Sequence, residues 1–290
     1  MGTSAGVTLD APAPGGYNVP NNGLATWLAH STDLPLPRGA REGGMAEEQR
    51  LEWEALPTEE LVEELEYVGL RLPLGLVEEI LRRGKDALEP LGRRVADASL
   101  WESDGDERWA PLHALHLLGA IGEPAAVGFI LDALRINPEP DEIIENTPTV
   151  LGHLGPEVIP ELSRFILDES VDGLMRGVAC DGLVSIAVLH PEHRDEVARF
   201  LRRFLEEAAQ HDREAVTAAI LSLVELRDKE SRPAIAAAFR SGHVDTDLVT
   251  LEDVHEAFQQ PERVRDDWHF TGDPLEFFQP ERLEKMRSKE

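Results

Sequence analysis

Two stretches of similar pattern decide the fold: LLGAIGEPAAVGFILDAL at residues 117–134 and VLGHLGPEVIPELSRFIL at residues 150–167. In each, a leucine–glycine pair is followed three residues later by a second glycine, Gly122 in the first copy and Gly155 in the second. An apolar run follows this glycine in both copies. The likeness indicates an internal repeat, and the shared glycine indicates a turn between two helices.

Further copies of the pattern extend in both directions. Gly84 opens GKDALEPL, which has the same shape as GPEVIPEL at Gly155, so the turn glycines at 84, 122 and 155 lie 38 and 33 residues apart. Weaker copies follow at residues 187–201 and 224–239. Units of about 32 to 40 residues, each made of two helices around a short turn, are typical of an α-solenoid.

The residues between the turns have the period of helices. In TEELVEELEYVG, residues 58–69, the apolar side chains of Leu61, Leu65 and Val68 fall on one side, and Thr58 is placed as the N-cap. REAVTAAILSLVEL, residues 213–226, repeats this spacing, and no stretch shows the sustained alternation of a half-buried strand. The sequence therefore predicts an all-α fold, an α-solenoid of about five antiparallel helical pairs.

The stretch LGHLGPEVIPEL, Leu151 to Leu162, resembles the core of HEAT repeats, in particular those of the phycobilisome-lyase-like subclass. The resemblance covers roughly residues 57–258, and the copies at either end are degenerate, as in capping repeats. It implies a superhelix whose concave surface, usually formed by the second helix of each pair, binds proteins or peptides.

Composition divides the chain into three parts. Residues 1–44 hold eight glycines, five prolines and five charged side chains, which predicts a disordered tail. Arg41-Glu42-Gly43 also has codons that resemble a bacterial ribosome-binding sequence ahead of Met45, so a misassigned leader is the alternative. Residues 45–260 form the predicted solenoid. Residues 261–290 hold four aromatic residues, and we expect this tail to cap the last repeat.

The charge of the chain restricts its partners. There are 56 acidic against 28 basic residues, a formal net charge of −28, which disfavours nucleic acid and acidic membrane surfaces. No run of about 18 apolar residues is present. The single cysteine, Cys180, excludes an intramolecular disulfide and fits a reducing cytoplasm.

Candidate catalytic groups are few. His113 and His116 lie three residues apart, but no third ligand is placed near them, and we expect them on the flank or outer side of their helix. One His-Glu pair, His255-Glu256, is too little for a di-iron site, and the apolar surroundings of Cys180 indicate a packed thiol. The sequence predicts no catalytic residue, no metal site and no cofactor.

What remains is an interaction protein, a scaffold or adaptor that binds a protein or peptide. The alternative is an enzyme or enzyme accessory of the HEAT-like lyase type, acting on a small molecule or a protein-bound cofactor. The second helices are expected near residues 86–97, 124–135, 156–168, 192–209 and 229–240. Their candidate binding residues are Asp132, Arg135, Glu161, Arg164, Arg199 and Arg203.

The N-terminal edge of the predicted solenoid is strongly acidic. Nine acids lie between Glu47 and Glu66, against one base, Arg50. A concentrated negative field speeds encounter with basic surfaces. We therefore expect a partner with a basic segment. The acids that would contact it include Glu59, Glu60, Glu63 and Glu64.

Overall fold

The computed structural model describes residues 51–136, 141–260, 268–280 and 282–283. The chain divides into two units, residues 1–37 and 38–290, and all described residues belong to the second. The predicted disordered tail or misassigned leader at residues 1–44 lies outside the described residues.

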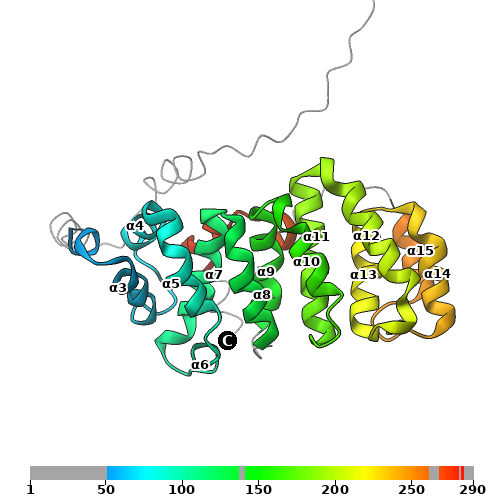
Figure 1. The fold of residues 1–290 in the computed structure, drawn as a ribbon, viewed down its shortest axis with the longest axis horizontal. Helices are drawn as coiled ribbons and strands as arrows, with labels where there is room; N and C mark the ends of the chain where they lie inside the picture. Colours follow the sequence, from blue (N-terminus) through cyan, green and yellow to red (C-terminus); the bar gives the residue numbers. More distant parts are fainter. Residues whose placement is uncertain (1–50, 137–140, 261–267, 281, 284–290) are drawn as a thin grey trace, which may run out of the picture. The chain divides into compact units, whose positions relative to one another are not determined.

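Every regular element in the described residues is helical, which confirms the predicted all-α class (Figure 1). The α-helices are α3 (Thr58–Glu63), α4 (Leu74–Arg83), α5 (Leu88–Val95), α6 (Ala98–Trp101), α7 (Ala110–Ile121), α8 (Val127–Ile136), α9 (Asp141–His153), α10 (Ile159–Ile166), α11 (Gly173–Leu189), α12 (Arg194–Glu206), α13 (Arg213–Glu225), α14 (Arg232–Ser241), α15 (Leu251–Gln259) and α16 (Trp268–Thr271). The 3-10 helices are η1 (Glu64–Glu66), η2 (Gly84–Ala87), η3 (Asp106–Trp109), η4 (Pro124–Ala126), η5 (Pro156–Val158), η6 (Pro191–His193), η7 (Ala208–Gln210), η8 (Lys229–Ser231) and η9 (Pro274–Phe278).

Helices follow one another in pairs, with a short 3-10 turn before each second helix. The second helices are α5, α8, α10, α12 and α14, and each falls inside or within a residue of the range expected from the sequence. The three repeat glycines have positive φ angles, +54° at Gly84, +68° at Gly122 and +88° at Gly155, as a turn that favours glycine requires. In the degenerate copy after α13, Arg227 takes the positive φ of +51° instead.

The first helices of successive pairs pack against one another. Helix α7 contacts α9, α9 contacts α11, and α11 contacts α13, so neighbouring pairs bury one continuous apolar core. Glycines allow the close approach of α9 and α11: a Cβ at Gly152 would lie 2.1 Å from Ser185 Oγ, and one at Gly182 2.5 Å from Leu151 Cδ1. These neighbour contacts fit the predicted solenoid.

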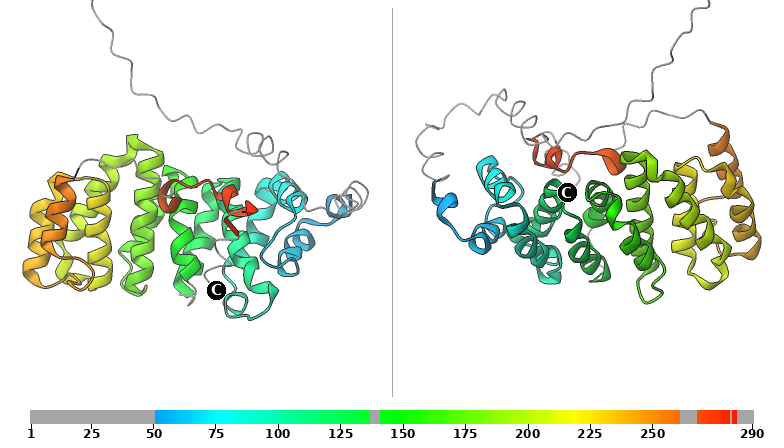
Figure 2. Two further views of the ribbon diagram at one scale, coloured as in Figure 1. Left: turned by 180° about the vertical axis from the view of Figure 1, so that it is seen from behind. Right: turned by 45° about the horizontal axis from the view of Figure 1, so that its top comes forward.

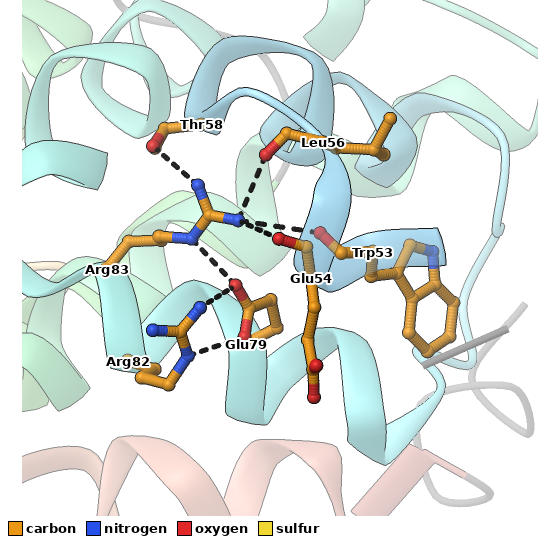
Figure 3. A network of polar contacts seen from close by, with 7 residues as sticks. All are labelled: Trp53, Glu54, Leu56, Thr58, Glu79, Arg82 and Arg83. Atoms are coloured by element: carbon orange, nitrogen blue, oxygen red, sulfur yellow. Dashed lines mark hydrogen bonds and ion pairs between the residues drawn. The ribbon is translucent and has the colours of Figure 1, made fainter. Parts of the chain in front are cut away.

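Arg83 connects the N-terminal edge to the first helical pair through hydrogen bonds (Figure 3). Arg83, in the last turn of α4, donates to the backbone oxygens of Leu56 at 3.0 Å and Glu54 at 3.3 Å, near the end of the helical residues 51–55. Its Nε donates to Glu79 at 2.7 Å. Thr58, the predicted N-cap of α3, is instead the first residue of that helix, and its hydroxyl oxygen accepts from Arg83 at 3.1 Å.

A partly buried ion pair connects α11 to α13. The side chain of Arg176 is fully buried; it donates to the backbone oxygen of Ile166 at 3.2 Å and pairs with Asp212. Asp212 is also the N-cap of α13, where its carboxylate accepts from the backbone N–H of Ala215. The same two residues therefore hold two helices in register.

No single helix in the described part of the chain is long and apolar enough to cross a membrane. Helix α11 and the stretch from Pro191 to Glu206 reach the length and composition only together, with a bend of 120° at their break.

The chain end does not lie where the sequence analysis placed it. The prediction that the aromatic tail caps the last pair is wrong for its described residues, because α16 contacts α9 and α11, and η9 contacts α7 and α9. Figure 2 shows this segment, in red, across the middle helices. The physical reason is that side chains of the middle helices donate hydrogen bonds to backbone carbonyls of the segment and pack against its aromatic rings, as described below.

Candidate functional site

The site consists of a peptide-like segment and the helices that receive it. We call residues 268–283 the C-terminal segment; Glu281 is outside its described residues. We call the stripe on α7, α9 and α11 beneath it the covered face. The side chains of the covered face that contact the segment are His113, His116, Thr149, His153, Asp181 and Ser185.

The covered face binds the backbone of the segment through side chains. The hydroxyl of Ser185 on α11 donates to the carbonyl of Phe270 at 2.6 Å. On α9, the hydroxyl of Thr149 at 2.8 Å and the Nε2 of His153 at 2.9 Å both donate to the carbonyl of Gly272. Buried backbone carbonyls in or after the last turn of a helix need partners from elsewhere, and three side chains of α9 and α11 supply them here.

One side chain of the segment also reaches the helices. His269 Nδ1 donates to the backbone oxygen of Glu145 at 3.1 Å, and its Nε2 lies 3.5 Å from the carboxylate of Asp181. The ring of the same histidine meets Phe270 edge-on. The start of the segment is therefore held between α9 and α11 by polar contacts of both backbone and side chain.

Two phenylalanines anchor the second half of the segment on α7. The ring of Phe277 stacks on His116, with centroids 3.9 Å apart, and meets His113 edge-on at 5.8 Å. The ring of Phe278 stacks on His113 at 5.9 Å. Phe277 is fully buried and Phe278 is 4% exposed, so the hydrophobic effect supplies most of this anchoring.

The two histidines are buried, which the sequence analysis did not predict. We expected His113 and His116 on the flank or outer side of α7, and both have no exposed surface. The reason is the C-terminal segment, which covers the side of α7 that faces away from the core. His113 Nε2 donates to the backbone oxygen of Gly69 at 2.8 Å, and His116 Nε2 donates to Asn146 Oδ1 at 3.1 Å.

Burial keeps these histidines neutral. It lowers the pKa of His113 to about 4, against which the hydrogen bond to Gly69 acts weakly. Burial also holds the pKa of His116 well below its ordinary value, with the charge of Arg282 adding to the effect. The pKa of His153 is lowered by burial as well. The histidines of the covered face are thus uncharged at neutral pH, suited to aromatic rings and backbone carbonyls.

The predicted binding residues lie elsewhere, on the second helices. Asp132, Arg164, Arg199 and Arg203 are exposed. Arg135 donates to Asp168 at 2.8 Å across to the end of α10, and Arg164 pairs with Glu161 at 2.7 Å within it. Arg135 and Arg164 thus form ion pairs, but the six predicted binding residues do not come together in one site. Their role in binding stays a prediction.

The acidic edge is partly neutralised. Glu59 pairs with Arg93 and with Arg94, and its pKa is lowered mainly by the hydrogen bond from Arg94. Glu60 and Glu63 are exposed and Glu64 is partly exposed, without an ion pair among the described residues. Residues 47–50 lie outside the described range.

The other residues considered as candidate reactive or metal-binding groups are Cys180, His255 and Glu256. Cys180 is buried, and burial raises the pKa of its thiol, as expected of a packed side chain. His255 and Glu256 are both exposed on α15. Within the described residues, no three His, Cys, Asp or Glu side chains come together as a metal site.

Sequence reasoning missed the covered face, although one signal for it was present. Gly119 was interpreted only as a repeat marker, yet a Cβ there would lie 3.0 Å from Pro274 of the segment. Thr149 and Ser185 are polar residues at buried helical positions, which is uncommon without a partner. Such positions, together with an aromatic chain end, indicate a segment that folds back.

The comparisons with known proteins give a family but no activity. A family model described as a protein of unknown function, DUF1186, matches residues 56–267, which includes most of the helical pairs. Neither a curated protein nor a solved structure matches the chain. The match spans well over half of the 290 residues, and the chain therefore belongs to the DUF1186 family.

Proposed function

We propose that this protein is an interaction protein whose covered face binds a short, aromatic-containing peptide of a protein partner. The observation that carries the proposal is the binding of the C-terminal segment, a chain of short helical turns, through Ser185, Thr149 and His153, whose hydrogen bonds to it all reach backbone carbonyls. Contacts to the backbone do not depend on the sequence of the bound segment. Sequence preference then comes from the positions of Phe277 and Phe278 over two histidines.

In this proposal the C-terminal segment is an intramolecular ligand that a partner peptide replaces. A tethered segment competes at an effective concentration on the order of millimolar, so a free peptide binds weakly until the segment is loosened. The acids at the N-terminal edge, of which Glu60, Glu63 and Glu64 make no ion pair among the described residues, favour a partner with a basic segment.

The test uses a fluorescent peptide with the sequence of residues 268–283 and the full-length chain. Fluorescence anisotropy should show weak binding to the wild type. Binding should be at least about tenfold tighter to the variant Phe277→Ser/Phe278→Ser, because the internal competitor is weakened. Adding Thr149→Val and Ser185→Ala to that variant should abolish the gain. A peptide of scrambled sequence is the control.

Two outcomes would overturn the proposal. One is a double variant that keeps its helical circular dichroism and binds the peptide no better than the scrambled one. The other is binding that Thr149→Val and Ser185→Ala leave unchanged. If the double variant loses helix content, Phe278→Ser alone keeps the fully buried Phe277 in place and gives the same comparison.

A further inference from the structure

A cavity of about 360 Å³ lies at the N-terminal ends of α7 and α9. Trp101 and Trp109 line it together with Leu112, and its polar lining includes Glu102, Asp104 and Glu142. Both tryptophans are less than a tenth exposed. None of the described residues of the C-terminal segment lines this cavity.

The cavity carries a negative balance of charge. Glu102 and Asp104 are exposed, Glu142 is partly buried, and none of the three forms an ion pair with a described residue. The one basic residue of the lining, Arg108, places its guanidinium 4.8 Å from the centroid of the Trp109 ring. Three carboxylates therefore face one guanidinium, and the face of Trp109 already holds a cation.

The cavity lies next to the covered face, because residues that line it precede residues of the covered face at helical spacing. Trp109, the last residue of η3, precedes His113 of α7 by four residues, and His116 follows three residues later. On α9, Glu142 precedes Asn146 and Thr149 with the same spacing. Trp109 therefore lies one helical turn from His113, next to the end of the covered face.

We infer that this cavity binds a lysine or arginine side chain of the partner peptide, a few residues beyond the aromatic pair that rests on His113 and His116. Carboxylates select cations over neutral and acidic groups, and the ring of Trp101 offers apolar surface to the aliphatic stem of such a side chain. The inference rests on the proposed function and adds to it the chemistry of the partner: two aromatic residues followed by a basic one.

The test compares peptides that differ at one side chain. The parent peptide carries Phe-Phe followed by lysine four to seven residues later, and matched peptides carry norleucine or glutamate at that position. In the full-length Phe277→Ser/Phe278→Ser chain, the lysine peptide should bind about tenfold more tightly than the norleucine peptide. The same ratio is expected in the wild type at higher peptide concentration.

Substitutions in the cavity should remove this preference. Asp104→Asn with Glu142→Gln should bring the lysine peptide to the affinity of the norleucine peptide, whose own affinity stays unchanged. Glu142→Arg should reverse the order in favour of glutamate. Glu192→Gln, an exposed acid in η6, is the matched control and should change nothing.

The outcomes separate the inference from the proposed function. Equal binding of the lysine and norleucine peptides would overturn the cation site and leave the peptide-binding face intact. A preference for lysine that survives Asp104→Asn/Glu142→Gln would place the recognition elsewhere and also overturn it. Absence of binding by every peptide would overturn both.

Discussion

The imidazole of His116 lies flat against the ring of Phe277, with centroids 3.9 Å apart and planes within 10°. This contact joins the first helix of an early repeat to the end of the chain. It also places a titratable group in a site without exposed surface, where an aliphatic side chain would pack as well. We therefore expect closure of the C-terminal segment to be coupled to protonation of this histidine.

Stability should fall as the pH falls below about 6.5. The pKa of His113 is lowered to about 4 in the folded chain and that of His116 is lowered too, so the unfolded chain binds more protons in this range. The stabilisation is complete above the unfolded pKa and is lost between about pH 6.5 and 4. Each histidine should remove up to about 1.4 kcal/mol per pH unit.

Urea unfolding at pH 7, 6 and 5 measures this slope in the wild type and in His116→Gln. The glutamine amide does not titrate and can still reach Asn146, so its slope should be shallower. The charged and titratable groups that act on His116 are Arg282 of the segment and His113. His255→Gln on the exposed side of α15 is the control. Equal slopes in all three chains would show that the buried pair does not couple closure to pH.

The repeat glycines should be needed for their backbone conformation. Gly84 has φ +54° with no atom near an added Cβ, so Gly84→Ala tests strain alone and should cost about 1–2 kcal/mol. Gly128 in α8 has equally open surroundings, and Gly128→Ala should stabilise by about 0.4–1 kcal/mol. Thermal unfolding of both variants gives the comparison. Equal changes in stability for Gly84→Ala and Gly128→Ala would contradict the claim that the turn at Gly84 needs glycine for its positive φ.

Much of this fold follows from local pattern. Turn glycines, helix period and repeat spacing are properties of a few neighbouring residues, so the pairs and the second helices could be predicted. The path of the C-terminal segment is different, because it depends on which distant surface satisfies its carbonyls. Ser185 and Phe270 are far apart in sequence, and no local pattern pairs them. The covered face and the burial of His113 and His116 depend on that pairing.

The ion pair of Arg176 and Asp212 should be costly to break from one side only. Asp212→Asn keeps an N-cap for α13 but leaves the fully buried guanidinium of Arg176 without its carboxylate, which should cost about 3 kcal/mol. Arg176→Met should cost less, because Asp212 keeps 39% of its side-chain surface exposed. The double variant should resemble Arg176→Met. Urea unfolding at pH 7 measures all three, and additive losses would exclude the coupling.

The acidic edge should set how fast a basic peptide arrives. Stopped-flow binding of a lysine-containing peptide to the full-length Phe277→Ser/Phe278→Ser chain should slow between about 50 and 200 mM salt, where the Debye length shrinks to roughly 7 Å. Glu60→Gln/Glu63→Gln/Glu64→Gln should reproduce the slowing at low salt. Glu59 is left out because it pairs with Arg93 and Arg94. The control is Glu192→Gln/Asp195→Asn/Glu206→Gln, which changes the net charge by the same amount at exposed positions elsewhere. If this variant associates as slowly as the edge variant, the slowing is an effect of net charge and not of the acidic edge.

The most direct measurement of the central claim is hydrogen exchange in the C-terminal segment of the wild-type chain, with and without excess peptide of residues 268–283. The amides of Glu276, Gln279 and Leu283 donate to carbonyls within the segment, so their exchange reports its opening. We predict that they exchange by local opening, faster than the amides of α9 and α11, and that the peptide accelerates them while the helices stay protected. Exchange at the rate of α9 and α11, unchanged by saturating peptide, would show that the segment is a fixed part of the fold and no replaceable ligand.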